Sequence, residues 1–148
     1  MSTYSFMDVQ ATLVGPTGLI NLGYGAALAE EGITIEMAGD KNTMTIGADG
    51  EGMHSLHADK SGTVTVRLLQ TSPTNAKLQV MYDAQTISSS LHGQNLITVR
   101  NPVSGDVTTA RSCAFKKKPA LNYKKDGAVV EWVFDSVKID SILGTYPG

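Results

Sequence analysis

Two histidines, His54 and His57, are the residues of this sequence with the clearest capacity for chemistry. They stand three positions apart, with Glu51 and Asp59 close by, a spacing that can bring two metal ligands together on a helix or a turn. A structural zinc site usually needs four ligands, and the third histidine and the single cysteine lie far along the chain. We therefore interpret His54 and His57 as hydrogen-bonded loop residues rather than as metal ligands.

No other residues form a convincing catalytic or cofactor-binding motif. Ser55 lies beside both histidines but lacks the Gly-x-Ser-x-Gly context of a hydrolase nucleophile. The segment 47–52 is rich in glycine but lacks the lysine and the Ser or Thr of a phosphate-binding loop. Cys113 lies in an alternating apolar segment, where a small buried side chain is expected. We therefore expect no enzymatic activity, no metal and no cofactor.

Acidic and basic residues occupy separate segments of the chain. Between positions 30 and 51 there are six acids and one base, and between positions 111 and 125 there are six bases and no acid. The acids are Glu30, Glu31, Glu36, Asp40, Asp49 and Glu51, and the bases include the run Lys116, Lys117 and Lys118. Such a separation favours head-to-tail self-association. The plainer alternative is that both segments are solvated faces.

Length and composition predict a single globular domain over residues 1–148. The chain has 41% hydrophobic and 18% charged residues and a net charge of −2, which argues against a protein that reads nucleic-acid sequence. It contains no apolar run near 18 residues and no signal-peptide pattern at its start. We expect a soluble protein that stays in the cell that makes it and has no membrane partner.

The middle of the chain predicts a strand that runs directly into a helix. Residues 63–70 alternate between polar and apolar side chains. Ser72 is placed to cap a helix, with Pro73 at its first position. Leu78, Met81 and Tyr82 then recur at helical spacing, so a short amphipathic helix should cover one face of a sheet.

The remaining pattern is that of a mainly β protein. Residues 33–46 predict one hairpin and residues 96–115 a second one, and residues 139–143 predict a last turn of helix or an edge segment. Seven or eight strands with one helix indicate a two-sheet antiparallel sandwich or a barrel-like fold with one flanking helix. We expect a core made of Val64, Val66, Leu68, Phe115, Val130, Trp132 and Phe134.

The sequence also resembles the tail tube proteins of contractile-tailed bacteriophages. The resemblance is carried by residues 50–57 (GEGMHSLH), 61–69 (SGTVTVRLL), 71–76 (TSPTNA), 95–102 (NLITVRNP) and 113–119 (CAFKKKP). It extends from Tyr4 to about Leu143. It implies a two-sheet β structure with one flanking helix, six copies of which form a ring, while rings stack into a hollow tube that passes DNA.

The resemblance implies a structural protein of the virion tail that is made in the host cytoplasm. Its expected partners are further copies of itself, the tail sheath protein, and the baseplate and terminator proteins. DNA would pass through the lumen without specific binding. One alternative is the inner tube of another contractile injection machine, and another is a monomeric β-sandwich that binds a ligand.

Two surfaces are predicted to serve the assembly. In the hairpin 33–46, Ile33, Ile35, Met44 and Ile46 would face the core, while Thr34, Glu36, Thr43 and Thr45 would face the lumen. The loop 47–52 with residues 53–57 should become ordered only on a neighbouring subunit. The expected interface residues are Asp49, Glu51, His54 and His57 on this segment, and Lys116, Lys117 and Lys118 opposite them.

Overall fold

The structure, a computed structural model, describes residues 2–5, 8–23 and 32–147. The predicted acids Glu30 and Glu31 lie outside the described residues. The elements are β1 (Gln10–Gly15), β2 (Gly18–Gly23), β3 (Ile33–Met37), β4 (Asn42–Ile46), β5 (Gly52–Leu56), β6 (Gly62–Leu69), α1 (Thr74–Gln85), β7 (Asn95–Asn101), β8 (Asp106–Lys117) and β9 (Val129–Ile142).

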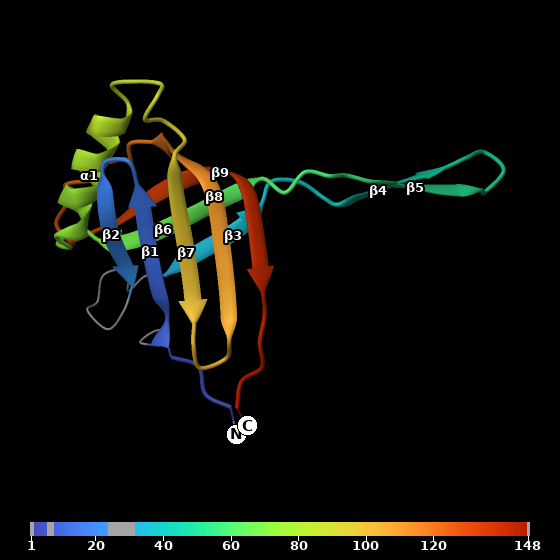
Figure 1. The fold of residues 1–148 in the computed structure, drawn as a ribbon, viewed down its shortest axis with the longest axis horizontal. Coiled ribbons are helices and arrows are strands. Elements are labelled where there is room, and N and C mark those ends of the chain that lie inside the picture. Colours follow the sequence, from blue (N-terminus) through green and yellow to red (C-terminus); the bar gives the residue numbers. More distant parts are fainter. Residues whose placement is uncertain (1, 6–7, 24–31, 148) are drawn as a thin grey trace.

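Seven strands form one antiparallel sheet in the order β2-β1-β7-β8-β9-β6-β3, and β4 and β5 pair separately. The large sheet folds over on itself (Figure 1), so that β2, β1, β7 and β8 form a front layer and β6 and β3 form a back layer. The long strand β9 belongs to both layers, because its first half pairs with β6 and its second half continues along β8. The mainly β, sandwich-like fold with one helix is confirmed, and the described strands do not close a barrel.

The sheet turns its corner at matching irregularities in β8 and β9. In β8 the buried side chains Phe115 and Cys113 are two positions apart, but the next buried one, Ala110, is three positions away. In β9 the buried side chains occupy even positions as far as Ser136, and the next buried one is Ile139. In both strands the side chains that face the core thus change from one face of the strand to the other. Ser112 has φ of 52° at this point, in the left-handed region that non-glycine residues rarely adopt. A bulge of this kind increases the local twist and lets one sheet supply both layers.

The core lies between the two layers and beneath α1. All seven predicted core residues are buried, as are Leu78 and Met81 of the helix, while Tyr82 is partly buried and packs against the core. The helix is one residue shorter at its start than predicted: Pro73 occupies the N-cap position, and the Ser72 hydroxyl accepts a hydrogen bond from the Thr74 N–H at 3.3 Å. Helix ends vary by about one residue between criteria.

The predicted hairpin over residues 33–46 is wrong. β3 pairs with β6 in the back layer, from Ile33 opposite Val66 to Met37 opposite Gly62. β4 pairs instead with β5, and this hairpin projects away from the body as an arm, here defined as residues 38–61 (Figure 1). Residues 139–142 also differ from the prediction, because they extend β9 rather than forming a helical turn or a separate edge segment.

Candidate assembly surfaces

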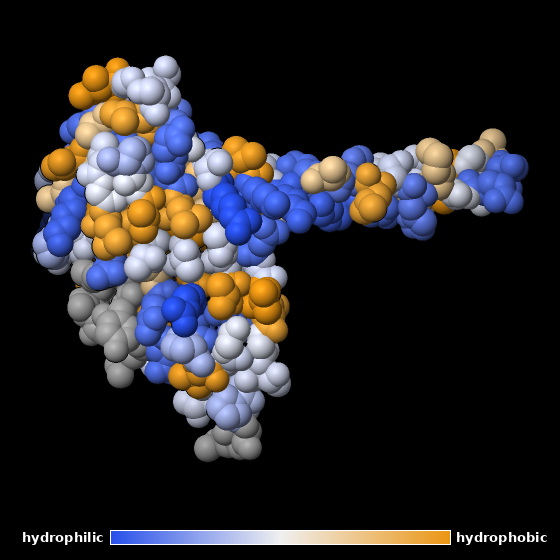
Figure 2. Space-filling view, viewed as in Figure 1, coloured by the Kyte–Doolittle hydropathy of each residue, from blue (hydrophilic) through white to orange (hydrophobic). Residues whose placement is uncertain are grey.

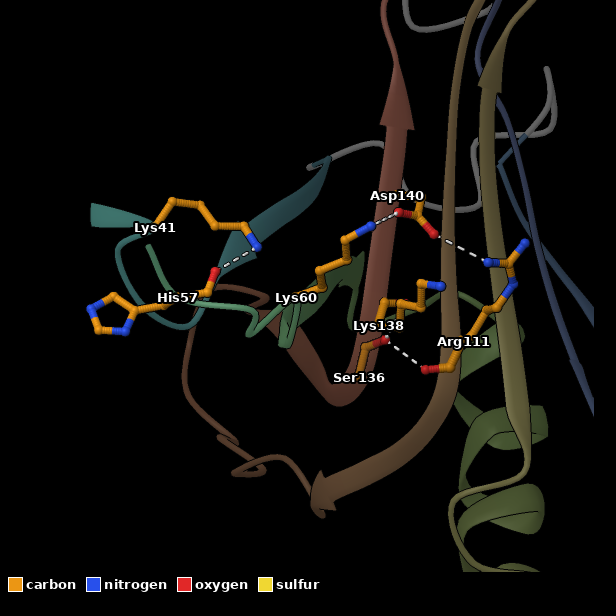
Figure 3. A network of polar contacts seen from close by, with 7 residues as sticks. All are labelled: Lys41, His57, Lys60, Arg111, Ser136, Lys138 and Asp140. Carbon is orange, nitrogen blue, oxygen red and sulfur yellow. Dashed lines mark hydrogen bonds and ion pairs between the residues drawn. The ribbon is translucent and has the colours of Figure 1, made fainter. Parts of the chain in front are cut away.

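The base of the arm is fixed firmly to the sheet. The Ile139 N–H donates to the Lys60 carbonyl at 2.9 Å, and the Ala38 N–H donates to the Ser61 carbonyl at 2.9 Å. The Lys60 ammonium also lies 3.2 Å from one carboxylate oxygen of Asp140, whose second oxygen lies 3.1 Å from Arg111 (Figure 3). Lys60 therefore holds the arm base against β9 through both its backbone and its side chain.

The charges around Asp140 shift its titration. The Lys60 hydrogen bond is the main cause of a pKa below the ordinary carboxyl value of 3.8, and the positive charges of Lys60, Lys138 and Arg111 add to it. The Asp140 side chain is 41% exposed, so solvent screening keeps its contribution to stability small. The contact between Lys60 and Asp140 therefore joins the arm base to β9 and adds little to the stability of the fold.

The arm beyond its base is an amphipathic ribbon with different side chains on its two faces. Facing residues in the ladder share a side of the ribbon, and the pairs Asn42–Leu56, Met44–His54 and Ile46–Gly52 define one face. We call Met44, Ile46 and Leu56 the apolar stripe; they are 59%, 55% and 86% exposed. The opposite face carries Thr43, Thr45, Met53 and Ser55.

The two histidines lie on opposite faces of the arm and hold its strands together. The Asn42 amide nitrogen lies 3.1 Å from His54 Nδ1, and the Thr43 hydroxyl lies 2.7 Å from His57 Nε2. The Lys41 ammonium donates to the His57 carbonyl at 3.1 Å (Figure 3). In the part of the chain that the structure describes, no group of three or more His, Cys, Asp or Glu residues could hold a metal ion.

The acidic segment 47–52 forms the tip of the arm and the turn between β4 and β5. The Gly47 N–H donates to the Glu51 carbonyl at 2.7 Å, and the Glu51 N–H donates to the Asp49 carboxylate at 3.1 Å. Asp49 and Glu51 are exposed and have no ion pair among the described residues. Two carboxylates are thus carried far from the body of their own subunit (Figure 1).

The basic run lies on the body and not on the arm. Lys116 and Lys117 end β8 and Lys118 follows it, and all three side chains are exposed. A groove of about 310 Å³ beside them is lined by Lys117, Pro119, Ala120, Asn122, Val129, Glu131 and Val133. One subunit therefore does not bring its acidic tip to its own lysine run, and contact between them would require a second copy.

The four predicted lumen residues lie in two different places. Thr34 and Glu36 are on β3 in the back layer, whereas Thr43 and Thr45 are on the arm. Across the back layer, Thr34 lies opposite Thr65, and Glu36 lies opposite Thr63, which in turn faces Asp135 of β9. Sequence reasoning missed Thr63, Thr65 and Asp135 as members of this polar surface, because the β3–β6 and β6–β9 ladders join distant parts of the chain.

Both ends of the sheet are open among the described residues. β2 pairs only with β1, and β3 pairs only with β6. Each end therefore presents a strand edge with unpaired backbone donors and acceptors, which is the usual template for pairing with another chain. The sequence pattern did not identify β2 and β3 as the edge strands, because this depends on how distant strands pair.

The single cysteine of the chain is held in the core. Cys113 is buried, its thiol donates to the Ala110 carbonyl at 3.3 Å, and burial raises its pKa above the ordinary value of 9.0. A thiol with a raised pKa is a poor nucleophile. Among the helices of the described residues, none is long and apolar enough to cross a membrane.

Comparison with solved structures finds a similar fold in proteins of contractile injection systems. A sheath/tube terminator of the PVC extracellular contractile injection system superposes with a TM-score of 0.63 at 9% identity, covering 96% of this chain and 98% of that chain. The cap of the anti-feeding prophage, a tube-terminating cap, gives a TM-score of 0.55 at 8% identity over 97% and 95% of the two chains. A chain of the PVC sheath–tube complex gives a TM-score of 0.55 at 12% identity, covering 90% of this chain and 88% of that chain.

At such low identities these likenesses show the fold alone. No relative was found among curated protein sequences. The family model of the bacteriophage PhiTE tail tube protein, however, matches residues 1–144, nearly the full length of the chain. The match agrees with the all-antiparallel fold, its exposed strand edges and its projecting arm. The chain belongs to the PhiTE tail tube protein family of bacteriophages, a family of structural rather than enzymatic proteins.

Proposed function

We propose that this tail tube protein assembles into hexameric rings that stack into a hollow tube and conduct DNA during ejection. The observation that carries the proposal is the combination of two open sheet ends with an arm whose β4–β5 ribbon, beyond its anchored base, pairs only with itself and projects from the body. An isolated two-stranded hairpin is only marginally stable in water. The arm therefore makes physical sense as an element that is covered by neighbouring subunits.

Ring closure is proposed to use the sheet ends. If β2 of one copy pairs with β3 of the next, each copy offers a different surface to each of its two neighbours. Such a contact closes into a ring when a whole number of the rotations that relate neighbouring copies adds up to about 360°. Pairing also removes both exposed edges, which would otherwise promote irregular aggregation. A second contact along the ring axis, made by the arm, would stack the rings.

The outer face of the back layer is proposed to line the lumen. Thr34 and Glu36 lie on it beside Thr63, Thr65 and Asp135. The same face carries Arg67, which donates to the Thr34 hydroxyl at 2.7 Å and lies 3.1 Å from Glu131, so its positive charge is paired within a surface of small polar groups and carboxylates. Because phosphate attraction dominates non-specific DNA affinity, this surface would let DNA pass without binding. Thr43 and Thr45 would reach the lumen only where the arm of a neighbouring copy borders it.

The interface candidates are proposed to meet between copies. Asp49 and Glu51 would lie against the run Lys116, Lys117 and Lys118 of a neighbour, while His54 and His57 keep the arm in its extended ladder. Sheath, baseplate and terminator proteins are the further partners of the tube. Synthesis in the host cytoplasm would precede assembly into the virion tail.

Electron cryo-microscopy of the purified protein tests the ring proposal directly. We expect sixfold rings stacked into a tube, with β2 of one subunit beside β3 of the next. Rings of another symmetry, or a protein that stays monomeric at all concentrations, would contradict the proposal. Imaging of intact particles then tests the role of the tube, since density for DNA inside the tube is expected during ejection.

The likeness to parts of the PVC system and the anti-feeding prophage favours one further candidate, an inner tube of another contractile injection machine. Fold and assembly would be the same and only the cargo would differ. Particles purified from the producing cells separate the two functions. A particle with a DNA-filled head supports the phage tail, and a headless particle supports the second candidate.

A further inference from the structure

An apolar groove lies between the edge strand β2 and the helix α1. Its volume is about 380 Å³, and it is lined on the strand side by Thr17, Gly18, Leu19 and Ile20 and on the helix side by Ala76, Lys77, Val80, Met81 and Ala84. Val80 is 69% and Leu19 63% exposed, so this groove leaves large aliphatic side chains in water. A groove of this volume has room for on the order of a dozen water molecules at the density of liquid water.

The apolar surface continues from the groove onto the front layer. Leu19 lies opposite Val14 of β1, and Val14 lies opposite Leu96 of β7, and all three side chains are exposed. Figure 2 shows apolar residues gathered over this part of the body. Contiguous exposed apolar surface of this kind marks an interaction site more often than scattered single residues do.

We propose that this groove receives the apolar stripe of the arm of a second copy. This inference rests on the proposed tube assembly and names the surface that accepts the arm. Met44, Ile46 and Leu56 line one face of the ribbon and have no apolar cover in their own subunit. They are the right chemical class for a groove lined by aliphatic side chains of β2 and α1.

The positions of the two surfaces also suit this contact. The arm leaves the body on the side opposite α1 and β2 (Figure 1), so copies arranged head to tail present an arm to a groove. Every chain carries one arm and one groove, so a contact between them can repeat without limit. Lys77 at the groove adds an opposite charge for the acidic arm. The copy that receives the stripe need not be the copy whose lysine run meets the arm tip.

Disulfide cross-linking between two single variants tests the contact. Met44→Cys protein is mixed with Val80→Cys protein and oxidised during assembly; Cys113 is buried and does not compete. A covalent dimer of the two variants is the expected result. Thr43→Cys, on the opposite face of the arm, serves as the matched control and should not link to Val80→Cys.

A second measurement uses charge. Val80→Asp should raise the protein concentration needed for tube formation by roughly tenfold or more, which corresponds to about 1.4 kcal/mol, and Met44→Lys should restore part of the loss. Val103→Asp is the control, because Val103 is an exposed valine outside this groove. A melt of each soluble subunit should stay unchanged, since both sites are exposed.

The outcomes separate this inference from the proposed function. Tubes that form normally, without a Met44–Val80 link and without an effect of Val80→Asp, overturn the groove contact and leave the tube intact. A link from Met44→Cys to Ala120→Cys alone would place the stripe in the groove beside Lys117 instead and would also overturn it. Failure of the unaltered protein to form tubes counts against the proposed function itself.

Discussion

Gln85 and Asn95 bind each other through two reciprocal amide hydrogen bonds in the interior of the protein. Gln85 Nε2 donates to Asn95 Oδ1 at 2.7 Å, and Asn95 Nδ2 donates to Gln85 Oε1 at 2.6 Å. Gln85 also donates to the Thr17 hydroxyl at 3.2 Å. The pair ties the end of α1 to β7 and to the turn before β2, and thereby sets one wall of the apolar groove.

Replacing one member of this pair should be costly. Asn95→Ala leaves the Gln85 amide buried without its partner, which costs about 1–3 kcal/mol, and Gln85→Ala should cost a similar amount. The double variant should lose less than the sum of the two, because the second change removes the orphaned group. Chemical denaturation measures all three, with Lys77→Ala at an exposed position of α1 as the control. Additive losses would show that the two amides act independently.

The backbone at Ser112 supports a second prediction, concerning the corner of the sheet. A non-glycine residue in the left-handed region costs roughly 1–2 kcal/mol, and the bulge in β8 requires that conformation. Ser112→Gly should therefore keep or slightly raise the free energy of unfolding, whereas Ser112→Val should lower it, since a β-branched residue fits this region worst. Equal stability of the glycine and valine variants would contradict the role of Ser112 at the corner.

The core and the helix could be predicted because both depend on local periodicity. Val64, Val66 and Leu68 alternate, as do Val130, Trp132 and Phe134, and the two sets face each other across the β6–β9 ladder. Residues 33–37 followed a similar rule, but their partner could not be predicted. The alternation of residues 33–37 is compatible with two partners, a hairpin with residues 42–46 or a ladder with residues 62–66. Tertiary packing selects the second.

The assembly surfaces were only partly predictable for a related reason. The acidic tip and the lysine run stand out as charge clusters in the sequence, whereas the apolar groove combines residues 17–20 with residues 76–84 and exists only after folding. The sequence pattern also failed to assign residues 139–142 to β9. At the corner the buried side chains change from even to odd positions, which breaks the alternation by which a strand is recognised. Those residues therefore resembled a separate segment.

Trp132 should be among the most costly residues to truncate. It is 2% exposed, and its indole N–H donates to Asn75 Oδ1 at 3.0 Å. Trp132→Ala should cost about 3–5 kcal/mol, as is usual for a buried large aromatic. Trp132→Phe keeps much of the packing but leaves the Asn75 carbonyl without its donor, so a smaller loss is expected. A loss below about 1 kcal/mol for the alanine variant, the range of surface changes, would mean that the ladder register is wrong.

The Asp140 carboxyl provides a test of how the arm is anchored. Because the Lys60 hydrogen bond lowers its pKa, Lys60→Met should raise that pKa toward 3.8, as followed by NMR titration. A lowered pKa stabilises the fold at pH values above the unfolded value, and this contribution is lost as the pH falls through the folded value. Lys124→Met, in an exposed loop, should leave the titration of Asp140 unchanged. An unshifted Asp140 in Lys60→Met would show that Arg111 alone holds the carboxylate.

The acidic arm tip should decide whether tubes grow. Asp49→Lys combined with Glu51→Lys places positive charge where the proposed contact meets Lys116, Lys117 and Lys118 of a neighbour, and like charges across an interface are strongly unfavourable. We expect no tubes by electron microscopy and an unchanged circular dichroism melt, because the tip contacts nothing in its own body. Asp83→Lys combined with Asp126→Lys changes the net charge equally at other exposed sites and should leave tube growth intact. Normal tubes from the tip variant would contradict the docking of the tip on the lysine run. Loss of the subunit fold would instead mean that the arm stabilises its own chain.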